Sequence, residues 1–345
     1  MLTLLSKSFG KPPRMEDVRR SPHFDGEKFV NPVPTHSLDR SQLPDVMWRS
    51  WARKGPRQPG PEYRFGETHR EELEKFDEIQ VNWLGHAAFL LHKAGKYFLL
   101  DPVLTERVSP FSFYGPKRFF PSPIPVEELP PLEAIVLSHD HYDHCDSEVL
   151  PQLADQTKHY ITPLGLRSTL EYWGIPGEKI TEMDWGDQFD GENFTVKAQP
   201  ARHFSGRGLK RDQILWCSYV LQIAEHNIYW AGDSGIFPGF ADIGEEHGPF
   251  ELALMPIGAY DDAWHNIHLN PEEALEVFEW LRGGRFFPNH WGTIDLAMHN
   301  WYEPMERLLE AAGEVDLLAA EPGRWVSHRS SQVDAEWWRG FLVEE

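Results

Sequence analysis

The densest group of chemically capable side chains in this sequence lies just after a short apolar run. His139, His141, Asp143 and His144 follow one another as His-x-His-x-Asp-His, directly after a predicted buried strand at 134–137. A strand places the loop that follows it rigidly, and alternate residues of an extended segment point the same way. The imidazoles of His139 and His141 can therefore converge on one metal ion, while Asp143 and His144 turn towards a second. Imidazole and carboxylate ligands of this kind suit Zn²⁺, Mn²⁺ or Fe²⁺.

A set of short strands must hold this loop in place. The alternation of Ile79, Val81 and Trp83 with polar residues predicts a half-buried strand, and residues 89–92 and 97–100 predict a hairpin. Further apolar runs predict strands at 159–162, 194–199, 218–223, 227–230, 252–256 and 285–288.

Helices alternate with these strands. Asn270 can cap a helix whose first position suits Pro271, and Glu273 completes a capping box. Leu275, Phe278 and Leu281 give this helix an apolar face, and Gly283-Gly284 is expected to end it; further helices are predicted at 164–173, ended by Gly174, and at 303–312. Strand clusters interleaved with helices predict a layered α/β protein.

Residues 1–75 differ from the rest of the chain. They are rich in proline and arginine and show no sustained period of a helix or strand. We expect an extended arm that packs on a main domain of residues 76–345, because Phe24, Phe29, Trp48 and Trp51 supply apolar anchors. A disordered tail is the alternative.

Composition limits the partners and the compartment. The 345 residues carry a net charge of -21, and a strongly acidic surface repels nucleic acid. The basic stretch 202–211 is an exception that could meet an anionic substrate. The two cysteines, Cys145 and Cys217, are no disulfide framework, and no apolar run has the length of a membrane span. We therefore expect a cytoplasmic protein.

The His-x-His-x-Asp-His motif and the polar residues at later strand ends resemble the metallo-β-lactamase superfamily. The resemblance implies a four-layer αβ/βα sandwich, with two mixed β-sheets flanked by helices. It adds three metal ligands, His203, Asp233 and His290, each of which follows a predicted strand. Alone, His203 would be read as a surface histidine and Asp233 as a turn residue. Because they follow the motif in the expected order, each after a predicted strand, the three together indicate a metal site more strongly than any one of them alone.

A closer resemblance is to the family of N-acyl-phosphatidylethanolamine-hydrolysing phospholipases D. The segments that carry it are 83–87 (WLGHA), 101–102 (DP), 115–119 (GPKRF), 138–144 (SHDHYDH), 257–260 (IGAY), His268 with 271–274 (PEEA), and 290–293 (HWGT). It implies hydrolysis of N-acyl-phosphatidylethanolamine to N-acylethanolamine and phosphatidic acid, peripheral contact with a membrane, and a homodimer.

The same resemblance assigns roles to individual residues. It implies two Zn²⁺ ions, with Mn²⁺ or Fe²⁺ as substitutes, which together activate water and polarise the bond under attack. His139, His141 and His203 would hold one ion, Asp143, His144 and His290 the other, and Asp233 would bridge them. Tyr142 and His268 would contact the substrate head group, and Asp143, Asp233 and His268 would serve the chemistry.

Several alternatives remain open. Asp101 is either a support for a ligand histidine or a turn residue before Pro102, and His86 is more often a buried, hydrogen-bonded histidine. Histidines such as His159, His226, His247 and His299 are expected on the surface or in packing. The same metal site would also serve a lactonase, a sugar-phosphate or small phosphodiester hydrolase, or a metal-binding protein without turnover.

Overall fold

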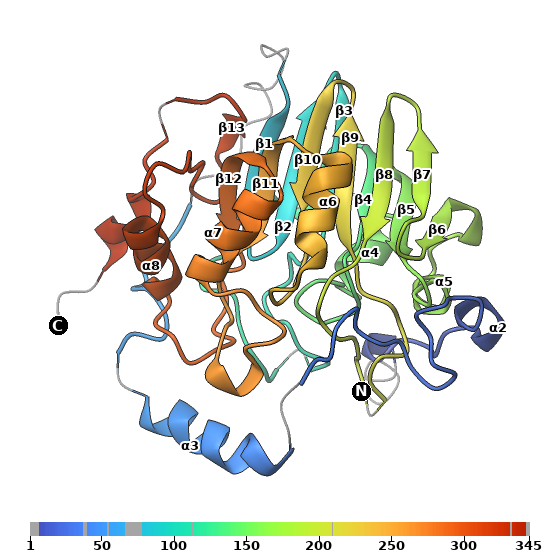
Figure 1. Cartoon of the computed structure of the whole chain (residues 1–345), viewed down its shortest axis with the longest axis horizontal. Coiled ribbons are helices and arrows are strands. Elements are labelled where there is room, and N and C mark those ends of the chain that lie inside the picture. The colour runs from blue at the N-terminus through green and yellow to red at the C-terminus, as the bar shows by residue number, and fades with distance from the viewer. Residues whose placement is uncertain are drawn as a thin grey trace.

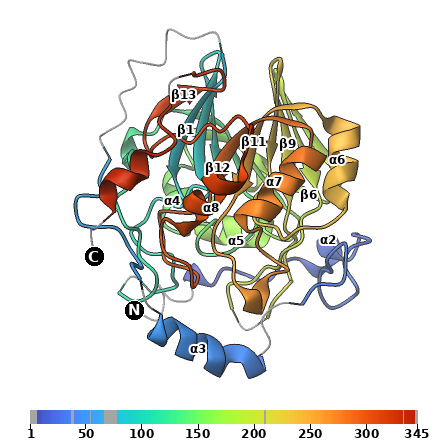
Figure 2. The same cartoon turned by 60° about the vertical axis from the view of Figure 1, so that its left-hand side comes forward.

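A computed structural model describes residues 7–36, 40–53, 55–65, 78–111, 113–208, 210–331 and 333–342. Two β-sheets lie face to face at its centre, with helices on both outer sides (Figures 1 and 2). This is the predicted four-layer arrangement of two mixed sheets flanked by helices.

The seven-stranded sheet has the order β13-β1-β2-β3-β4-β5-β6. In this sheet β1, β2 and β3 pair antiparallel, and β3 to β6 pair parallel. At one edge β13 pairs antiparallel with β1. The strands are β1 Gln80–Gly85, β2 Ala88–Lys93, β3 Lys96–Leu100, β4 Leu132–Val136, β5 Thr157–Pro163, β6 Ile180–Met183 and β13 Trp325–Ser327.

The six-stranded sheet has the order β12-β11-β10-β9-β8-β7. Here β7 to β10 are antiparallel and β10 to β12 are parallel. The strands are β7 Gln188–Gly191, β8 Phe194–Gln199, β9 Ser218–Ile223, β10 His226–Trp230, β11 Phe250–Pro256 and β12 Gly283–Asn289. The strands predicted at 194–199 and 218–223 are confirmed with the same bounds, whereas β6, β7 and β13 were not predicted.

The main core lies between the two sheets. Phe89 of β2 meets Phe287 of β12 edge-on, with 5.1 Å between ring centroids, and Trp83 of β1 lies 6.4 Å from the same ring. The prediction that β1 is half-buried was wrong, because all six of its residues are buried. Its polar residue Asn82 is accommodated by donating a hydrogen bond to Gly323 O, 3.0 Å away.

Helices cover both outer faces (Figures 1 and 2). A second apolar cluster joins the seven-stranded sheet to α4 and α5, through residues such as Leu90, Ile135, Leu150 and Leu170. On the other side α7 packs on β11 and β12 and on its neighbours α6 and α8. The helices are α2 Met15–Val18, α3 Leu43–Ala52, α4 Val149–Gln152, α5 Arg167–Trp173, α6 Gly239–His247, α7 Pro271–Trp280 and α8 Glu303–Ala311. The short 3-10 helices are η1 Arg40–Gln42, η3 Val126–Glu128, η4 Gly177–Lys179, η5 Asp262–Trp264 and η6 Trp337–Phe341.

The predicted start of α7 is confirmed, and its predicted end is not. Asn270 Oδ1 accepts from Glu273 N at 2.9 Å, and Glu273 Oε2 accepts from Asn270 N at 3.1 Å, which completes the capping box. Gly283 opens β12 instead of ending the helix. A Cβ atom there would lie 2.1 Å from the Phe278 ring, so glycine lets the helix pack against the start of the strand.

The described parts of the N-terminal segment pack on the main body. Phe29 is buried, Trp173 Nε1 donates to Lys7 O at 2.7 Å, and Tyr63 lies 5.0 Å from Trp301 in an aromatic cluster. The expectation for the tryptophans was wrong, because Trp48 and Trp51 on α3 are 62% and 77% exposed. The boundary predicted at residue 75 lies outside the described residues.

The two cysteines are free thiols, as the sequence predicts. Cys145 and Cys217 are both buried. In the described part of the chain, no helix has the length and apolar character needed to cross a bilayer.

Candidate metal centre

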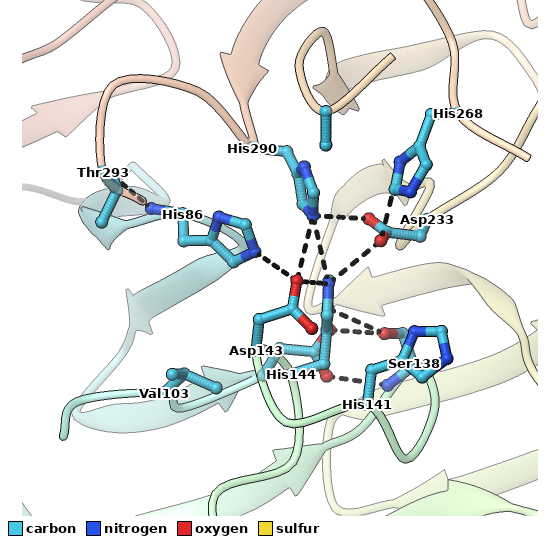
Figure 3. A network of polar contacts seen from close by, with 12 residues as sticks. His86, Val103, Ser138, His141, Asp143, His144, Asp233, His268, His290 and Thr293 are labelled. Atoms are coloured by element: carbon cyan, nitrogen blue, oxygen red, sulfur yellow. Dashed lines mark hydrogen bonds and ion pairs between the residues drawn. The ribbon is translucent and has the colours of Figure 1, made fainter. Parts of the chain in front are cut away.

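The motif loop begins where β4 ends, at the edge to which the parallel strands of both sheets direct their carboxyl ends. The loop turns tightly, because His144 N and Cys145 N both donate to His141 O, at 3.1 and 2.8 Å. This turn brings His139, His141 and His144 to one side, where residues that follow β8, β10 and β12 meet them. Figure 3 shows His141 and His144 near Asp233 and His290.

Three histidines form the first group. His139 Nε2 lies 2.7 Å from His141 Nδ1, which lies 3.3 Å from His203 Nε2. His203 Nδ1 donates to Ile267 O at 2.9 Å, so its Nε2 carries the free lone pair of a neutral ring. Three nitrogens therefore converge on one point, as the ligands of a single ion do.

Asp143, His144 and His290 form the second group. His144 Nε2 lies 3.2 Å from His290 Nε2, and Asp143 Oδ2 lies 3.6 Å from the former and 3.7 Å from the latter. The sequence predicted these three residues as one ligand set, and the structure places them together.

Asp233 approaches both groups, and Figure 3 shows its contacts with His290 and His144. Its carboxylate oxygens are 3.1 Å from His144 Nε2 and 3.2 Å from His290 Nε2, and 3.8 Å from His203 Nε2 on the other side. Gly232 makes this approach possible: its φ is +57°, and a Cβ atom would lie 2.9 Å from the Ser138 side chain.

A layer of buried partners holds the ligand side chains. Asp101 Oδ2 accepts from His144 Nδ1 at 2.6 Å and also binds the Ser138 hydroxyl. His86 Nε2 lies 2.9 Å from Asp143 Oδ2 (Figure 3). His86, Asp101 and His290 all have positive φ, of 54°, 36° and 63°. Such strained backbone persists only where the surroundings enforce it, and here it surrounds the cluster.

The charges in the cluster are strongly coupled. Burial lowers the pKa of His141 and of His203 to about 3, so both rings are neutral at pH 7 and able to act as ligands. Burial works against ionisation of Asp233, but the nearby His144 and His290 outweigh it and hold its pKa well below the usual range. The pKa of His144 is raised well above its usual value, since Asp233, Asp143 and Asp101 outweigh its burial.

The donor set fits two divalent ions. The imidazoles of His139, His141 and His203 face one another with nitrogens 2.7 to 3.3 Å apart, and the ionised carboxylate of Asp233 stands beside them. Lone pairs directed at one another are favourable only around a cation or a shared proton. The buried histidine and aspartate groups are thus consistent with a binuclear metal site.

A hollow of about 230 Å³ opens over this cluster. Its polar floor includes Asp143, Asp233 and His290, its walls are the apolar side chains Phe204, Trp264, Ile267 and Leu296, and Arg211 and His268 stand beside them. His268 Nδ1 is 3.9 Å from Asp233 Oδ2 and, among the described residues, has no hydrogen-bond partner.

The basic stretch 202–211 divides into two kinds of arginine. Arg207 is buried and donates to Asp140 O and Cys145 O, and Arg202 donates to Ile236 O and Asn266 Oδ1. These two serve the fold, whereas Arg211 lines the hollow with its guanidinium 5.0 Å from the Phe204 ring. Sequence reasoning flagged the stretch but could not tell its members apart.

Tyr142 stands apart from the other predicted site residues. Its hydroxyl donates to Arg207 O at 2.7 Å, and its ring packs near Val103 and Ile294 rather than lining the hollow. Its role in substrate binding stays a prediction. The apolar walls Phe204, Trp264 and Leu296 were not predicted, because nothing in their spacing marks them.

The fold, the strand-end ligands and the hollow together define a class of protein. Residues 96–291 match the family model described as the beta-lactamase superfamily domain. This match covers more than half of the chain, and the chain belongs to the metallo-β-lactamase superfamily, as a metal-dependent hydrolase with a histidine and aspartate metal site.

Individual proteins are also similar to this chain. An uncharacterised protein of Mycobacterium tuberculosis is 38% identical over 93% of this chain and 88% of its own length. N-acyl-phosphatidylethanolamine-hydrolyzing phospholipase D 1 of Caenorhabditis elegans is 38% identical over 67% of this chain and 68% of its own length. Among solved structures, the metallo-β-lactamase fold protein YhfI of Bacillus subtilis matches with a TM-score of 0.53 and 15% identity, covering 73% of this chain and 99% of that one, and shows the fold alone.

Proposed function

We propose that this protein is a phosphodiesterase of the phospholipase D type, which cleaves N-acyl-phosphatidylethanolamine into N-acylethanolamine and phosphatidic acid. The observation that carries the proposal is the mixed character of the hollow. A cationic side chain, Arg211, and an imidazole, His268, line it together with the apolar side chains Trp264, Ile267 and Leu296, next to Asp143, Asp233 and His290 of the cluster. A phosphodiester with an acylated head group likewise carries a charged group close to an apolar chain, which matches the charged and apolar side chains of the hollow.

The chain's own residues suit the task of holding a phosphodiester. Burial lowers the pKa of His268 to about 3, so its ring is neutral at pH 7 and donates a hydrogen bond without adding charge. His268 would hold one phosphoryl oxygen and Arg211 another, while Asp143 and Asp233 stay ionised to bind cations. When bound, two divalent ions supply an activated water and neutralise charge that develops on the phosphoryl group.

The size of the hollow sets where the rest of the lipid must lie. A volume of about 230 Å³ accommodates a head group but not two long acyl chains. The glycerol-linked chains would stay in a membrane or micelle, and the mouth of the hollow would have to face it.

Helix α3 supports such an orientation. Arg49 holds it to Asp261 with two hydrogen bonds of 2.8 and 2.9 Å, and Arg53 Nη2 lies 3.1 Å from Asp295 Oδ1, next to Leu296 of the hollow. Its outer side carries Met47, Trp48 and Trp51, which are 71%, 62% and 77% exposed. We call these three residues the α3 patch. Exposed indoles favour the interface of a bilayer, where an amphipathic ring meets both water and lipid.

A small soluble substrate is the second candidate, and a second hollow favours it. Its volume is about 290 Å³, it shares His268, and it is lined mainly by polar residues that include Asp261, Glu303 and Arg307. A lactone or small phosphodiester could enter by this polar side without any contact with a membrane.

One experiment separates the two. Metal-loaded protein is given N-acyl-phosphatidylethanolamine in mixed micelles, or a soluble phosphodiester or lactone, and the products are identified by mass spectrometry. His139→Ala and Asp233→Ala test the cluster, and His247→Ala, a partly exposed histidine outside it, is the matched control. We expect phosphatidic acid and N-acylethanolamine from the wild type and His247→Ala only. Turnover of the soluble compounds alone would overturn the lipid assignment, and equal turnover by all four proteins would overturn the site.

A further inference from the structure

A second group of metal-ligating side chains lies at the opposite end of the six-stranded sheet. His226 is the first residue of β10, Glu251 is the second residue of β11, and His328 follows directly after β13. Asp233 follows the other end of β10, so one strand length, roughly 15 Å for five residues, separates this group from the strand end that leads to Asp233. The mechanism proposed above uses none of the three residues.

The three side chains converge on one oxygen atom. Glu251 Oε2 lies 2.9 Å from His226 Nδ1 and 3.1 Å from His328 Nε2, and the two rings are 4.8 Å apart. A tetrahedral ion with bonds of about 2.0 to 2.1 Å keeps its ligand atoms about 3.3 Å apart. Both contacts would need to open by only a few tenths of an ångström to admit such an ion.

The surroundings fit a bound ion better than a surface cluster. His226 and His328 are only 3% and 4% exposed, whereas Glu251 is partly exposed and, with His328, lines a surface hollow of about 670 Å³. His328 Nδ1 is buried and, within the described part of the chain, makes no hydrogen bond. The hollow gives an ion a way in, and a water in it could complete the coordination.

The group also joins two parts of the fold. His226 and Glu251 belong to the six-stranded sheet, and His328 continues from β13, the edge strand of the seven-stranded sheet. Arg285 Nη1 of β12 already holds His328 O at 2.8 Å, so the backbone that carries this ligand is fixed against the other sheet. An ion here would fasten the edge of one sheet to the other.

We propose that His226, Glu251 and His328 form a further metal site, for Zn²⁺ or another divalent ion that accepts imidazole and carboxylate ligands, and that this ion fastens the two sheets at the end away from Asp233. Two imidazoles and one carboxylate are a common protein ligand set for zinc.

The test counts bound metal in the full chain. Wild type, Glu251→Gln, His328→Gln and the control His159→Gln are dialysed against the same free Zn²⁺ concentration, and zinc per chain is measured by inductively coupled plasma mass spectrometry. Glu251→Gln keeps the shape and the hydrogen-bonding capacity of a partly exposed side chain and removes its charge, so it tests the site even if His328→Gln fails to fold. His159 is a partly exposed histidine of β5 outside this group.

We expect both site variants to bind one zinc ion fewer per chain than wild type and His159→Gln. Turnover should not change, because the strand-end cluster is untouched. The zinc-dependent rise in melting temperature should shrink in Glu251→Gln. An equal zinc count in wild type and folded Glu251→Gln would overturn the proposal, whatever substrate the protein turns over.

Discussion

The strand-end cluster and helix α3 are neighbours that the fold treats in opposite ways. In the cluster, charged and polar side chains are buried, and groups from other parts of the fold hold them: Asp101 holds His144, and Ile267 O holds His203. On α3, the apolar side chains of Met47, Trp48 and Trp51 are exposed, and Arg49 holds the helix to Asp261. The usual distribution of polar and apolar residues is inverted in both places.

This contrast suggests that the protein separates its chemistry from its choice of substrate. The cluster is coupled, so a change in one ligand disturbs the charge state of the others. The α3 patch is independent, so its residues can be altered without moving the cluster. Changes in the cluster should affect every substrate, and changes in the patch should affect only a substrate held in a lipid aggregate.

The largest effect should come from Asp233→Ala. The side chain lies between both histidine groups, 3.1 Å from His144 Nε2 and 3.8 Å from His203 Nε2, so its removal affects both ion positions. We expect kcat/KM to fall on the order of 10³-fold, since metal ions supply several kcal/mol of transition-state stabilisation. The loss should be the same for micellar and soluble substrates and should accompany a lower metal content. A loss confined to micellar substrate would contradict the separation.

His86→Ala should have the next largest effect. His86 Nε2 holds Asp143 Oδ2 at 2.9 Å, and the substitution removes this contact while leaving Asp143 in place. Supporting residues of this kind contribute roughly 10- to 100-fold to metal affinity. Competition with a chelator measures that affinity directly, and excess metal should restore most of the turnover. If metal affinity stays at the wild-type value, His86 serves packing alone.

The His86 contact also shows where sequence reasoning ends. The spacing of His139, His141, Asp143 and His144 was sufficient to predict a ligand loop, because all four residues share one turn after one strand. His86 and Asp143 are 57 residues apart and meet only because β1 and β4 belong to the same sheet. Their partnership depends on tertiary structure, and no local pattern encodes it.

The same limit applies to the fold and to the second metal site. Strands bounded by turn residues, such as 194–199, were predicted with their observed ends, and the capping box located the start of α7. His226 was expected on the surface or in packing, and it is buried; its grouping with Glu251 of β11 and with His328, which follows β13, was not predicted. The exposure of Trp48 and Trp51 was missed because aromatic residues usually anchor a segment to a core.

The pH dependence of the metal-free chain tests the coupling in the cluster. Burial lowers the pKa of His141, His203 and His268 to about 3, from an ordinary value of 6.5. Below pH 6.5 these three histidines bind protons in the unfolded chain, whereas in the folded chain they bind protons only near pH 3. The free energy of unfolding therefore falls with decreasing pH in this window, by up to about 1.4 kcal/mol per pH unit for each histidine.

Urea denaturation in the presence of a chelator, at pH 7 and at pH 5, measures this slope. His203→Gln should flatten it by the contribution of one proton, and replacement of the exposed His265 should leave it unchanged. If the free energy of unfolding of His203→Gln changes with pH as steeply as that of the wild type, the folded chain does not keep His203 unprotonated between pH 7 and pH 5.

The smallest effect should come from the α3 patch. Trp48 and Trp51 lie with ring centroids 5.1 Å apart on the exposed side of the helix. Losing one partly inserted indole costs about 1 kcal/mol, or about fivefold in binding. We expect Trp51→Ala to raise the apparent KM for micellar substrate by that factor and to leave kcat and the turnover of a soluble phosphodiester unchanged.

Tyr172→Ala is the matched control for the α3 patch. Tyr172 is another exposed aromatic residue, 37% accessible, and it lies on α5 of the main body. Because the chain carries a net charge of -21, binding through the α3 patch should be stronger on neutral phosphatidylcholine vesicles than on anionic vesicles, where like charges repel. Vesicle co-sedimentation measures this. Equal binding by wild type and Trp51→Ala would exclude α3 as the lipid-facing surface and would favour the polar hollow shared by His268 as the route to the cluster.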